Sequence, residues 1–389
     1  MDNFSYQNPT RIIFGKGAQK EVGAYTAQYG KKVLLHYGGG SIKRSGLYDQ
    51  VVQSLKDAEV DFVELGGVQP NPRLSLAKKG IELARAEGVD FILAVGGGST
   101  IDSSKCISIG VPYEGDVWDF YAHRAEPKTA LGIGVVLTIP AAGSESSDSS
   151  VITNEEGLHK VGLSSDIFIP KFAVLNPELT FTLPVYQVAC GVTDMLAHVM
   201  ERYFTNTKNV DLSDKLCEAI MRAIVHNGPI TVSHLSDYNA RAEIMWCGTL
   251  AHNGLVGMGR TGDWASHQIE HELSAMYDMA HGAGLAIIFP AWMKYVYKHD
   301  CTRFAQFANQ VFGVEYDYWN PENTALEGIA RLERFLVSIG MPIRLSQANL
   351  PNVEKDIPML SEKATENGPR GQFVKLETKD VAEIFRMAL

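Results

Sequence analysis

Short apolar runs alternate with helical patterns through the first half of the chain, and this alternation constrains the fold more than any other feature. The runs of strand length cover residues 12–14, 31–37, 61–65, 89–95, 132–140 and 171–177. Helical patterns fall between them at residues 18–30, 48–58, 74–87 and 101–109. Strands that are joined by helices lie mostly parallel in one sheet, with helices on both of its faces. The first half is therefore predicted to be an α/β unit.

From Pro184 onward the sequence changes to long helical patterns with few strand signals. These patterns cover residues 184–204, 211–226, 241–256, 264–276, 284–297, 302–312, 324–339 and 378–389. Pro184 suits the first residue of a helix, because its fixed φ fits there and its missing N–H would have no intrahelical partner. We therefore predict two domains, an α/β domain at residues 1–183 and an all-helical domain at residues 184–389. We expect ligands to bind in a cleft between them.

The length and composition are those of a soluble globular protein. Its 389 residues are many for one core, and 45% of them are apolar. The net charge of −10, without a run of Lys or Arg, argues against nucleic acid and membranes as partners. No signal peptide or membrane-spanning run is recognisable, and the 5 cysteines form no CxxC pair. We expect a cytoplasmic protein.

Three of the 11 histidines lie in one stretch, DWASHQIEHELSAMYDMAHGAG. His267 and His271 are four residues apart, which places them on one face of a helix, and His281 follows shortly after. Asp194 and His198 form a second pair with the same spacing. Each histidine alone also fits an amphipathic helix in which it is only a satisfied polar group. Two such pairs favour a metal site, and spacing alone leaves His271 open as a ligand.

Two glycine clusters follow the second and fourth apolar runs, and each could contribute to a cofactor site. In VGGGSTID, backbone without Cβ could approach a pyrophosphate closely, and the N–H groups that open a helix could bind its charge. This cluster is not the G-x-G-x-x-G fingerprint, and it equally fits a tight turn in which Ser99 caps a helix. Read alone, Asp102 is a first-turn acid, Thr138 a strand residue and Lys160 a surface residue.

Seven motifs in a fixed order carry a resemblance to a known family. They are FGKGA near the start, YGGGS at 37–41, PNP at 70–72, GGGSTID at 96–102, LTIPAAGSE at 137–145, DMLAH at 194–198 and the stretch of three histidines. The sequence resembles the iron-containing (group III) alcohol dehydrogenase family, and most closely its NADPH-dependent aldehyde reductase and butanol dehydrogenase branch. The resemblance implies a dehydroquinate-synthase-like fold, with a Rossmann-like dinucleotide-binding domain followed by a helical domain that holds a metal.

The resemblance also implies the residues of the site. It assigns the metal to Asp194, His198, His267 and His281 and leaves His271 unligated beside the nicotinamide. One carboxylate and three imidazoles suit a divalent ion such as Fe²⁺ or Zn²⁺. The residues that the resemblance places around the dinucleotide are Gly38, Gly39, Gly40, Ser41, Gly97, Gly98, Ser99, Asp102, Thr138, Ser147 and Lys160.

Gly39 bears on the choice between the two nicotinamide cofactors. In NAD-using relatives an aspartate stands at this position, where its charge repels the 2′-phosphate of NADP. Here the glycines leave room, Ser41 adds a hydroxyl donor, and Lys43 and Arg44 follow. We therefore expect NADP(H) to be preferred over NAD(H).

The family resemblance implies hydride transfer between NAD(P)H and an aldehyde or primary alcohol. We expect the metal to act as a Lewis acid on the aldehyde oxygen, and water or His271 to supply the proton. The alternatives are a glycerol dehydrogenase or dehydroquinate synthase of the same fold, a metal-dependent hydrolase, and a non-catalytic metal-binding protein. The last two leave the glycine clusters without a role. We further expect a homodimer, in which the strand at residues 12–14 could pair between subunits.

Overall fold

The computed structural model describes residues 1–389 and divides the chain into two compact units. One of them, here called the α/β unit, comprises Gln7–Leu183 and Leu235–Asn253. The other, the helical unit, comprises Met1–Tyr6, Pro184–His234 and Gly254–Leu389. The chain thus passes from the α/β unit to the helical unit at Pro184. Two segments lie in a different unit from the predicted one: residues 1–6 belong to the helical unit, and residues 235–253 belong to the α/β unit.

Specific hydrogen bonds explain where these two segments lie. In the later segment, Thr249 Oγ1 donates to the buried carboxylate of Glu145 at 2.6 Å, which ties it to the α/β unit. At the amino terminus, the N–H of Asp2 donates to the carbonyl of Gly259 at 2.9 Å within the helical unit. Such long-range partners leave no periodic signal in a sequence, and so the boundaries could not be predicted there.

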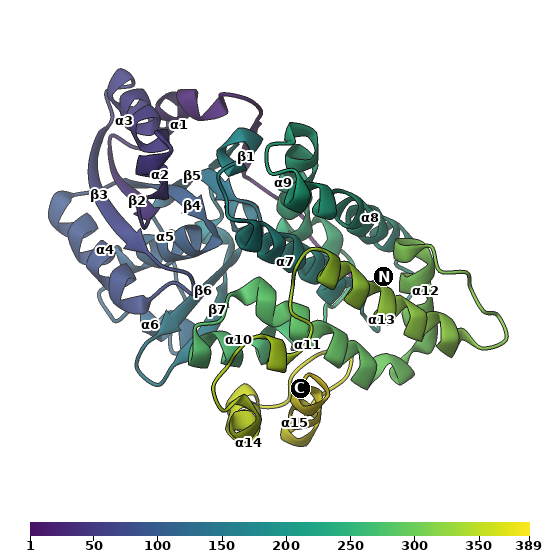
Figure 1. The fold of residues 1–389 in the computed structure, drawn as a ribbon. Helices are drawn as coiled ribbons and strands as arrows, with labels where there is room; N and C mark the ends of the chain where they lie inside the picture. The colour runs from purple at the N-terminus through teal and green to yellow at the C-terminus, as the bar shows by residue number, and fades with distance from the viewer. The chain divides into compact units, whose positions relative to one another are not determined.

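All six apolar runs form strands of one parallel sheet, as predicted (Figure 1). Its order is β1-β8-β5-β4-β2-β3, and every neighbouring pair is parallel. The strands are β1 (Arg11–Phe14), β2 (Lys32–Gly38), β3 (Asp61–Val68), β4 (Phe91–Gly97), β5 (Gly132–Ile139) and β8 (Phe172–Leu175). The predicted α/β class is confirmed.

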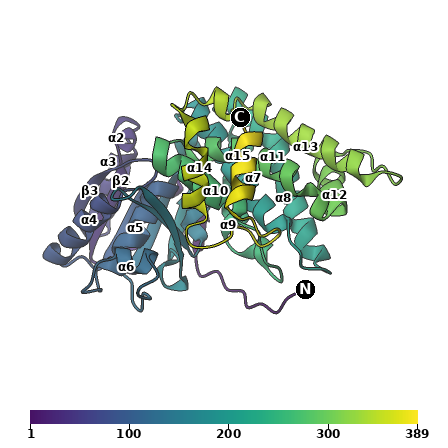
Figure 2. The ribbon, with the colours of Figure 1, turned by 90° about the horizontal axis from the view of Figure 1, so that it is seen from below.

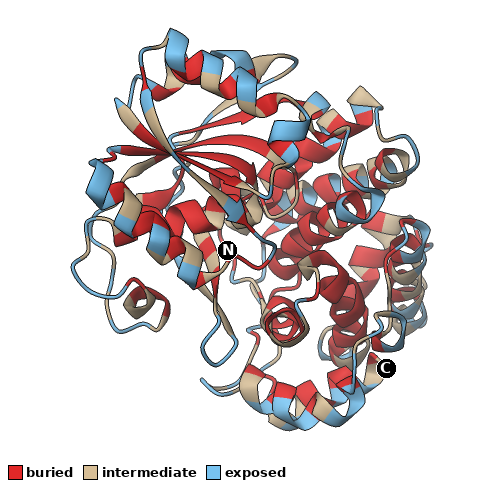
Figure 3. Cartoon of the chain, turned by 60° about the vertical axis from the view of Figure 1, so that its left-hand side comes forward, coloured by how far each residue is buried: buried red, intermediate tan, exposed pale blue.

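Helices cover both faces of this sheet, because its central strands are apolar on both sides. Leu34 of β2 and Ile92 of β4 belong to one core cluster, whereas their sequence neighbours Val33 and Leu93 belong to another. The first cluster takes in the helices at residues 74–87, 98–110 and 118–121, and the second takes in those at residues 22–26, 41–44 and 47–57. Figure 3 shows the strands buried along most of their length.

The helices of the α/β unit differ from the predictions mainly in length. They are α1 (Val22–Thr26), α2 (Ser41–Arg44), α3 (Leu47–Asp57), α4 (Leu74–Glu87), α5 (Gly98–Gly110), α6 (Trp118–Tyr121) and α9 (Tyr238–His252). The helix predicted at residues 18–30 is instead a short 3₁₀ turn followed by α1. A hairpin of β6 (Ser149–Asn154) and β7 (His159–Ser164) was missed, because its strands are short and largely polar.

The helical unit contains no strand, which agrees with the predicted all-helical pattern. Its helices are α7 (Val185–Tyr203), α8 (Asp211–Ser233), α10 (Ala265–Tyr277), α11 (His281–Val296), α12 (Cys301–Phe312), α13 (Pro321–Ser338), α14 (Val353–Ala364) and α15 (Thr378–Met387). Helix α14 was not predicted; it packs against α10 and α15 (Figure 2). No helix is long and apolar enough to cross a membrane.

Seven short 3₁₀ helices complete the chain: η1 (Ala18–Glu21), η2 (Ser144–Ser146), η3 (Asp166–Phe168), η4 (Pro177–Thr180), η5 (Leu255–Gly257), η6 (Tyr297–His299) and η7 (Leu345–Gln347).

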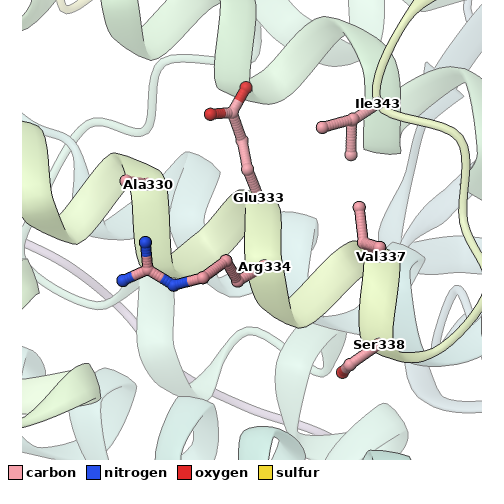
Figure 4. A pocket seen from close by; sticks show the side chains of 6 residues that line it. All are labelled: Ala330, Glu333, Arg334, Val337, Ser338 and Ile343. Atoms are coloured by element: carbon pink, nitrogen blue, oxygen red, sulfur yellow. The ribbon is translucent and has the colours of Figure 1, made fainter.

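A pocket of about 420 Å³ opens beside α13 and is lined by Ala330, Glu333, Arg334, Val337, Ser338 and Ile343 (Figure 4). Its lining has one acid and no histidine or cysteine, so this pocket lacks the side chains of a metal site.

His36 of β2 is a buried histidine that makes the stability of the fold depend on pH. Its Nδ1 lies 2.8 Å from the carbonyl oxygen of Leu65, and its Nε2 lies 2.9 Å from Ser103 Oγ. Burial lowers the pKa of His36 from 6.5 to about 4, although the hydrogen bond to Leu65 acts in the opposite direction. The unfolded chain therefore binds a proton near pH 6.5 while the folded chain remains neutral, and stability is lost as the pH falls from there towards 4.

We predict that lowering the pH from neutral to about 4 reduces the free energy of unfolding by about 3 kcal/mol through the protonation of His36 in the unfolded chain. Each pKa unit corresponds to about 1.4 kcal/mol. Urea unfolding over this range, for the wild type and for His36→Asn, measures the effect. Asparagine keeps an amide for hydrogen bonding but does not titrate. The wild-type free energy should fall more steeply than that of the variant, and equal slopes would contradict the prediction.

Candidate metal and cofactor sites

Helix α7 presents a row of polar side chains on one buried face. Asp194, His198 and Glu201 follow one another at intervals of four and three residues, which places them on the same side of the helix. All three are buried. A polar row inside an otherwise apolar core needs partners, and these come from α10 and α11.

Three imidazole nitrogens surround one carboxylate oxygen of this row. Asp194 Oδ1 lies 3.4 Å from Nε2 of His198, 3.9 Å from Nε2 of His267 and 3.8 Å from Nε2 of His281. His267 lies on α10, and His281 is the first residue of α11. Two ligands of one tetrahedral ion, each about 2.1 Å from it, lie about 3.4 Å apart. Each nitrogen therefore lies at about the distance from Asp194 Oδ1 that two ligands of one ion have, and the ligand atoms of Asp194, His267 and His281 all lie within 4.8 Å of one another.

The hydrogen bonding of these atoms also fits an ion. Asp194 Oδ1 and His267 Nε2 are buried, yet neither has a hydrogen-bond partner. A buried polar atom without a partner costs about 1–3 kcal/mol, and more when it is charged, so such atoms are rare in a folded protein. A divalent cation would satisfy both atoms at once. The donor set of one oxygen and three nitrogens suits Fe²⁺ or Zn²⁺ better than the all-oxygen shell that Ca²⁺ prefers.

The pKa of His267 shows that the carboxylates around it favour a positive charge at this position. Burial by itself lowers the pKa of His267, but the carboxylates of Asp194 and Glu201 outweigh it and raise the pKa to about 9. A metal ion would bind to the same Nε2 atom that takes up this proton. Metal and proton therefore compete for one position.

Two glycines of the sequence HGAG allow the three helices to meet. A Cβ on Gly282 would overlap the backbone of Cys190 on α7, so α11 can approach α7 only because this residue has no side chain. A Cβ on Gly284 would overlap the carboxylate of Glu270, which extends from α10 towards α11. The glycines next to His281 thus place this histidine close to Asp194.

His271, which spacing alone left open as a ligand, lies beside the cluster. It is half-buried on α10, with its ring centroid 5.6 Å from that of His281. Ligand atoms of Glu270, His271 and His281 form a second group that lies within 4.8 Å, whereas the first group consists of Asp194, His267 and His281. The first group contains the two unpartnered atoms, and this favours it as the metal site.

In the α/β unit, the two glycine clusters lie at neighbouring strand ends. Gly38 ends β2 and Gly97 ends β4, and these two parallel strands pair with each other. The helices that follow them pack on opposite faces of the sheet, since Ile42 and Ile101 belong to different core clusters. Such a reversal of direction is where open α/β sheets bind ligands, beyond the carboxyl ends of the strands. Ser99 is the second residue of α5 and therefore does not cap it.

A hydrogen-bonded network joins two of the predicted cofactor residues, Asp102 and Ser147. Asp102 accepts from Ser144 Oγ at 2.6 Å and from the N–H of Val151 at 3.0 Å. Lys105 Nζ, which is fully buried, donates to Ser144 Oγ at 3.0 Å and to the carbonyl of Ser147 at 2.9 Å. Burial lowers the pKa of Lys105 to about 8, against the opposing charge of Asp102.

Other predicted residues lie around this network. Burial raises the pKa of Asp102, and Lys160 of β7 is among the positive charges that act in the opposite direction. Thr138 lies one residue from the end of β5, the strand that pairs with β4.

Four residues of these sites were not predicted. Lys105 follows Asp102 at the helical spacing of three residues, and Ser144 lies in the motif at residues 137–145. Glu201 continues the row of Asp194 and His198, and Glu270 lies between His267 and His271. Their spacing could have identified each as a neighbour of the predicted residues, but not its contacts.

An α/β unit with glycines at the switch of its strand order, and a helical unit with an Asp–His₃ cluster, define a metal- and nucleotide-dependent dehydrogenase. Two family models match the chain: iron-containing alcohol dehydrogenase over residues 9–177, and the carboxy-terminal region of the Fe-containing alcohol dehydrogenase family over residues 188–389. The chain belongs to the iron-containing alcohol dehydrogenase family. It is an oxidoreductase that acts on an aldehyde and alcohol pair and uses NAD(P) and a divalent metal.

Individual relatives cover essentially all of the chain. It is 44% identical to the probable NADH-dependent butanol dehydrogenase 1 of Bacillus subtilis over 389 residues, with 100% of both chains covered. It is 37% identical to the NADPH-dependent aldehyde reductase YqhD of Escherichia coli, with 95% of this chain and 94% of that one covered. The crystal structure of NADH-dependent butanol dehydrogenase A from Thermotoga maritima matches it with a TM-score of 0.95 and 41% identity, covering 100% and 99% of the two chains. The predicted fold, family and enzyme class are confirmed.

Replacing one candidate ligand tests the metal site. We predict that His281→Ala binds substoichiometric metal and loses on the order of 100-fold or more in kcat/KM, because about 3 kcal/mol of charge stabilisation disappears with the ion. The far-ultraviolet circular dichroism should be unchanged, since the helices pack through their apolar faces. His234→Ala, which removes an exposed histidine of the same unit, is the matched control. Full metal content by elemental analysis together with near-normal turnover would contradict the ligand set.

Proposed function

We propose that this chain is an NADPH-preferring aldehyde reductase of the butanol dehydrogenase type. Asp194, His198, His267 and His281 would hold one divalent ion, Fe²⁺ or Zn²⁺. The observation that carries this proposal is the buried Asp194 Oδ1, which has three imidazole Nε2 atoms within 3.9 Å and no hydrogen-bond partner. The reaction converts an aldehyde, NADPH and a proton into a primary alcohol and NADP⁺, and it runs in both directions.

The bound ion would supply Lewis-acid stabilisation for the negative charge that develops on the aldehyde oxygen. The protein's own part is to hold the four ligand side chains in a fixed arrangement. Asp194, His198 and His267 are buried, and the tight packing at Gly282 leaves His281 little freedom. Such preorganisation means that little free energy is spent on rearranging the site during the reaction.

The substrate class is supported by the names of the relatives. The Bacillus and Thermotoga proteins are named butanol dehydrogenases, and the Escherichia protein is named an aldehyde reductase. A 1,3-propanediol dehydrogenase of Citrobacter freundii is more distant, at 30% identity. We therefore propose short, unbranched aldehydes such as butanal as substrates. A decrease in absorbance at 340 nm with butanal and reduced cofactor is the assay.

The preference for NADPH rests on the loop that follows β2. A Cβ built on Gly39 would meet no atom within 4 Å, so the loop leaves open space where an acidic side chain would repel a phosphate. Arg44 Nη1 lies 3.8 Å from the position of a Cβ on Gly40, so this cation lies close to the loop. Lys43 is held by Glu64 at 3.7 Å. We therefore assign the 2′-phosphate to Arg44 and Ser41.

A preference for NADH is the second candidate. Relatives at 41–44% identity are named NADH-dependent, whereas the NADPH-dependent relative is 37% identical. Sequence similarity thus favours NADH, and the open, positively charged loop favours NADPH. Comparing kcat/KM for the two reduced cofactors distinguishes the candidates.

Placing a charge at Gly39 tests the role of this loop. We predict that Gly39→Asp lowers kcat/KM for NADPH more than for NADH, because the carboxylate would repel the 2′-phosphate. The difference corresponds to about 1–3 kcal/mol of transition-state stabilisation. The backbone can accept the substitution, since Gly39 does not have a positive φ and its side of the loop is open. Gly39→Asn, of similar size and neutral, is the matched control. Equal losses with the two cofactors, or a wild-type preference for NADH, would contradict the proposal.

We further propose that His271 takes part in moving the proton to the product alkoxide. Its half-buried ring next to His281 lies near the proposed ion, and an imidazole can exchange protons near neutral pH. We predict that His271→Phe lowers kcat by on the order of 100-fold while the metal content stays stoichiometric. Normal turnover with an unchanged pH profile would exclude a role in proton transfer, and loss of metal would make His271 a ligand instead.

A homodimer completes the proposal. Strand β1 lies at the edge of the sheet and pairs only with β8, so one of its edges presents unpaired backbone groups. Phe14 at its end is 41% exposed. An edge strand with an exposed aromatic residue is suited to pairing with a second copy of the chain, and light scattering measures the resulting mass.

A further inference from the structure

We infer that Glu201 and Glu270 are positioning residues, each of which fixes a histidine that would bind the metal. Glu201 extends from α7 to His267 on α10, and Glu270 extends from α10 to His281 on α11. Helix α7 therefore orients a proposed ligand on α10, and α10 orients one on α11. This inference rests on the proposed metal site.

Glu201 makes three hydrogen bonds at the start of α10. Its Oε1 lies 2.8 Å from Nδ1 of His267 and accepts the N–H of the same residue at 3.0 Å. Its Oε2 accepts the N–H of Trp264 at 2.6 Å. Trp264 has a left-handed backbone with φ of 68°, which is uncommon for a residue with a side chain. One fully buried carboxylate thus fixes both the first turn of α10 and the ring of its histidine.

Glu270 holds His281 in a corresponding way. Its Oε2 accepts a hydrogen bond from Nδ1 of His281, and its Oε1 accepts one from Ser274 Oγ. The carboxylate is fully buried, and it fits there because Gly284 has no side chain. A charge buried this deeply is costly unless its partners are correctly placed.

The chemistry of imidazole explains what these contacts achieve. A neutral histidine has one N–H donor and one acceptor nitrogen. When Nδ1 carries the hydrogen and donates it to a carboxylate, Nε2 must present its lone pair, and the carboxylate makes that lone pair more basic. In both histidines it is Nε2 that faces Asp194, at 3.9 and 3.8 Å. The two glutamates therefore select the tautomer that the metal requires.

Glu270 allows the cleaner test. In Glu270→Gln the amide oxygen can still accept from His281, and the amide nitrogen can donate to Ser274 Oγ, whose hydroxyl then donates to the carbonyl of Met279 at 3.0 Å. These two hydrogen bonds are kept while the charge is lost. In Glu201→Gln, by contrast, an amide N–H would face the N–H of Trp264, so that variant also disturbs the start of α10.

The experiment measures metal binding by the full-length, metal-depleted protein. Competition with a chromogenic chelator gives the Zn²⁺ affinity, and the visible d–d spectrum of the Co²⁺ form reports the ligand geometry. We expect Glu270→Gln to weaken Zn²⁺ binding about 10-fold and Glu270→Ala about 100-fold, with a changed Co²⁺ spectrum in Glu270→Ala. The melting temperature of metal-free Glu270→Gln should match that of the wild type.

Glu218→Gln is the matched control, because Glu218 is equally buried in the helical unit but contacts Tyr203 and Gln306 instead of a histidine. Wild-type affinity and spectrum in Glu270→Ala would overturn the inference, and so would an equal loss of affinity in Glu218→Gln. His281→Ala in the same titration tests the metal site itself, independently of the positioning role of Glu270. If the wild type binds Zn²⁺ no more tightly than His281→Ala, the proposed metal site itself has failed.

Discussion

The helical unit depends on burying carboxylates next to histidines. Asp194, Glu201 and Glu270 all lie inside the core, where an uncompensated charge costs several kcal/mol. Hydrogen bonds from Nδ1 of His267 and His281 to the two glutamates offset part of this cost. A divalent cation bound at Nε2 would offset more of it. One arrangement therefore accounts both for the packing of α7, α10 and α11 and for the proposed affinity of the site for a cation.

In the α/β unit, the groups expected to contact a phosphate at the strand ends are neutral backbone groups. Its two glycine clusters end adjacent parallel strands, and backbone N–H groups at such ends attract a phosphate without a buried anion or cation. The buried cation Lys105 serves the loop at residues 144–149, where hydroxyl and carbonyl oxygens surround its ammonium group. Its partners satisfy its charge internally, so the glycine loops are left free for a ligand.

The sequence predicted what local periodicity and recognisable motifs encode. All six strands of the sheet and the same-face pair Asp194 and His198 follow from spacing along one element. The hairpin β6–β7, helix α14 and the contacts of Glu201 and Glu270 did not, because their partners lie on other elements. Spacing shows which side chains share a helix face, but it cannot show which other helix that face meets. For the same reason the four proposed metal ligands came from the family resemblance rather than from spacing.

The sequence HGAG illustrates why contacts between helices decide the geometry of such a site. Read locally, its glycines weaken a helix and suggest a loop, and so α11 was predicted to begin at residue 284 instead of at His281. In the structure each glycine removes a clash, Gly282 with the backbone of α7 and Gly284 with the carboxylate of Glu270. A methyl group at either position would push α11 away and move His281 from Asp194 without altering any ligand atom. The distance of 3.8 Å between His281 Nε2 and Asp194 Oδ1 thus depends on two residues that have no side chain.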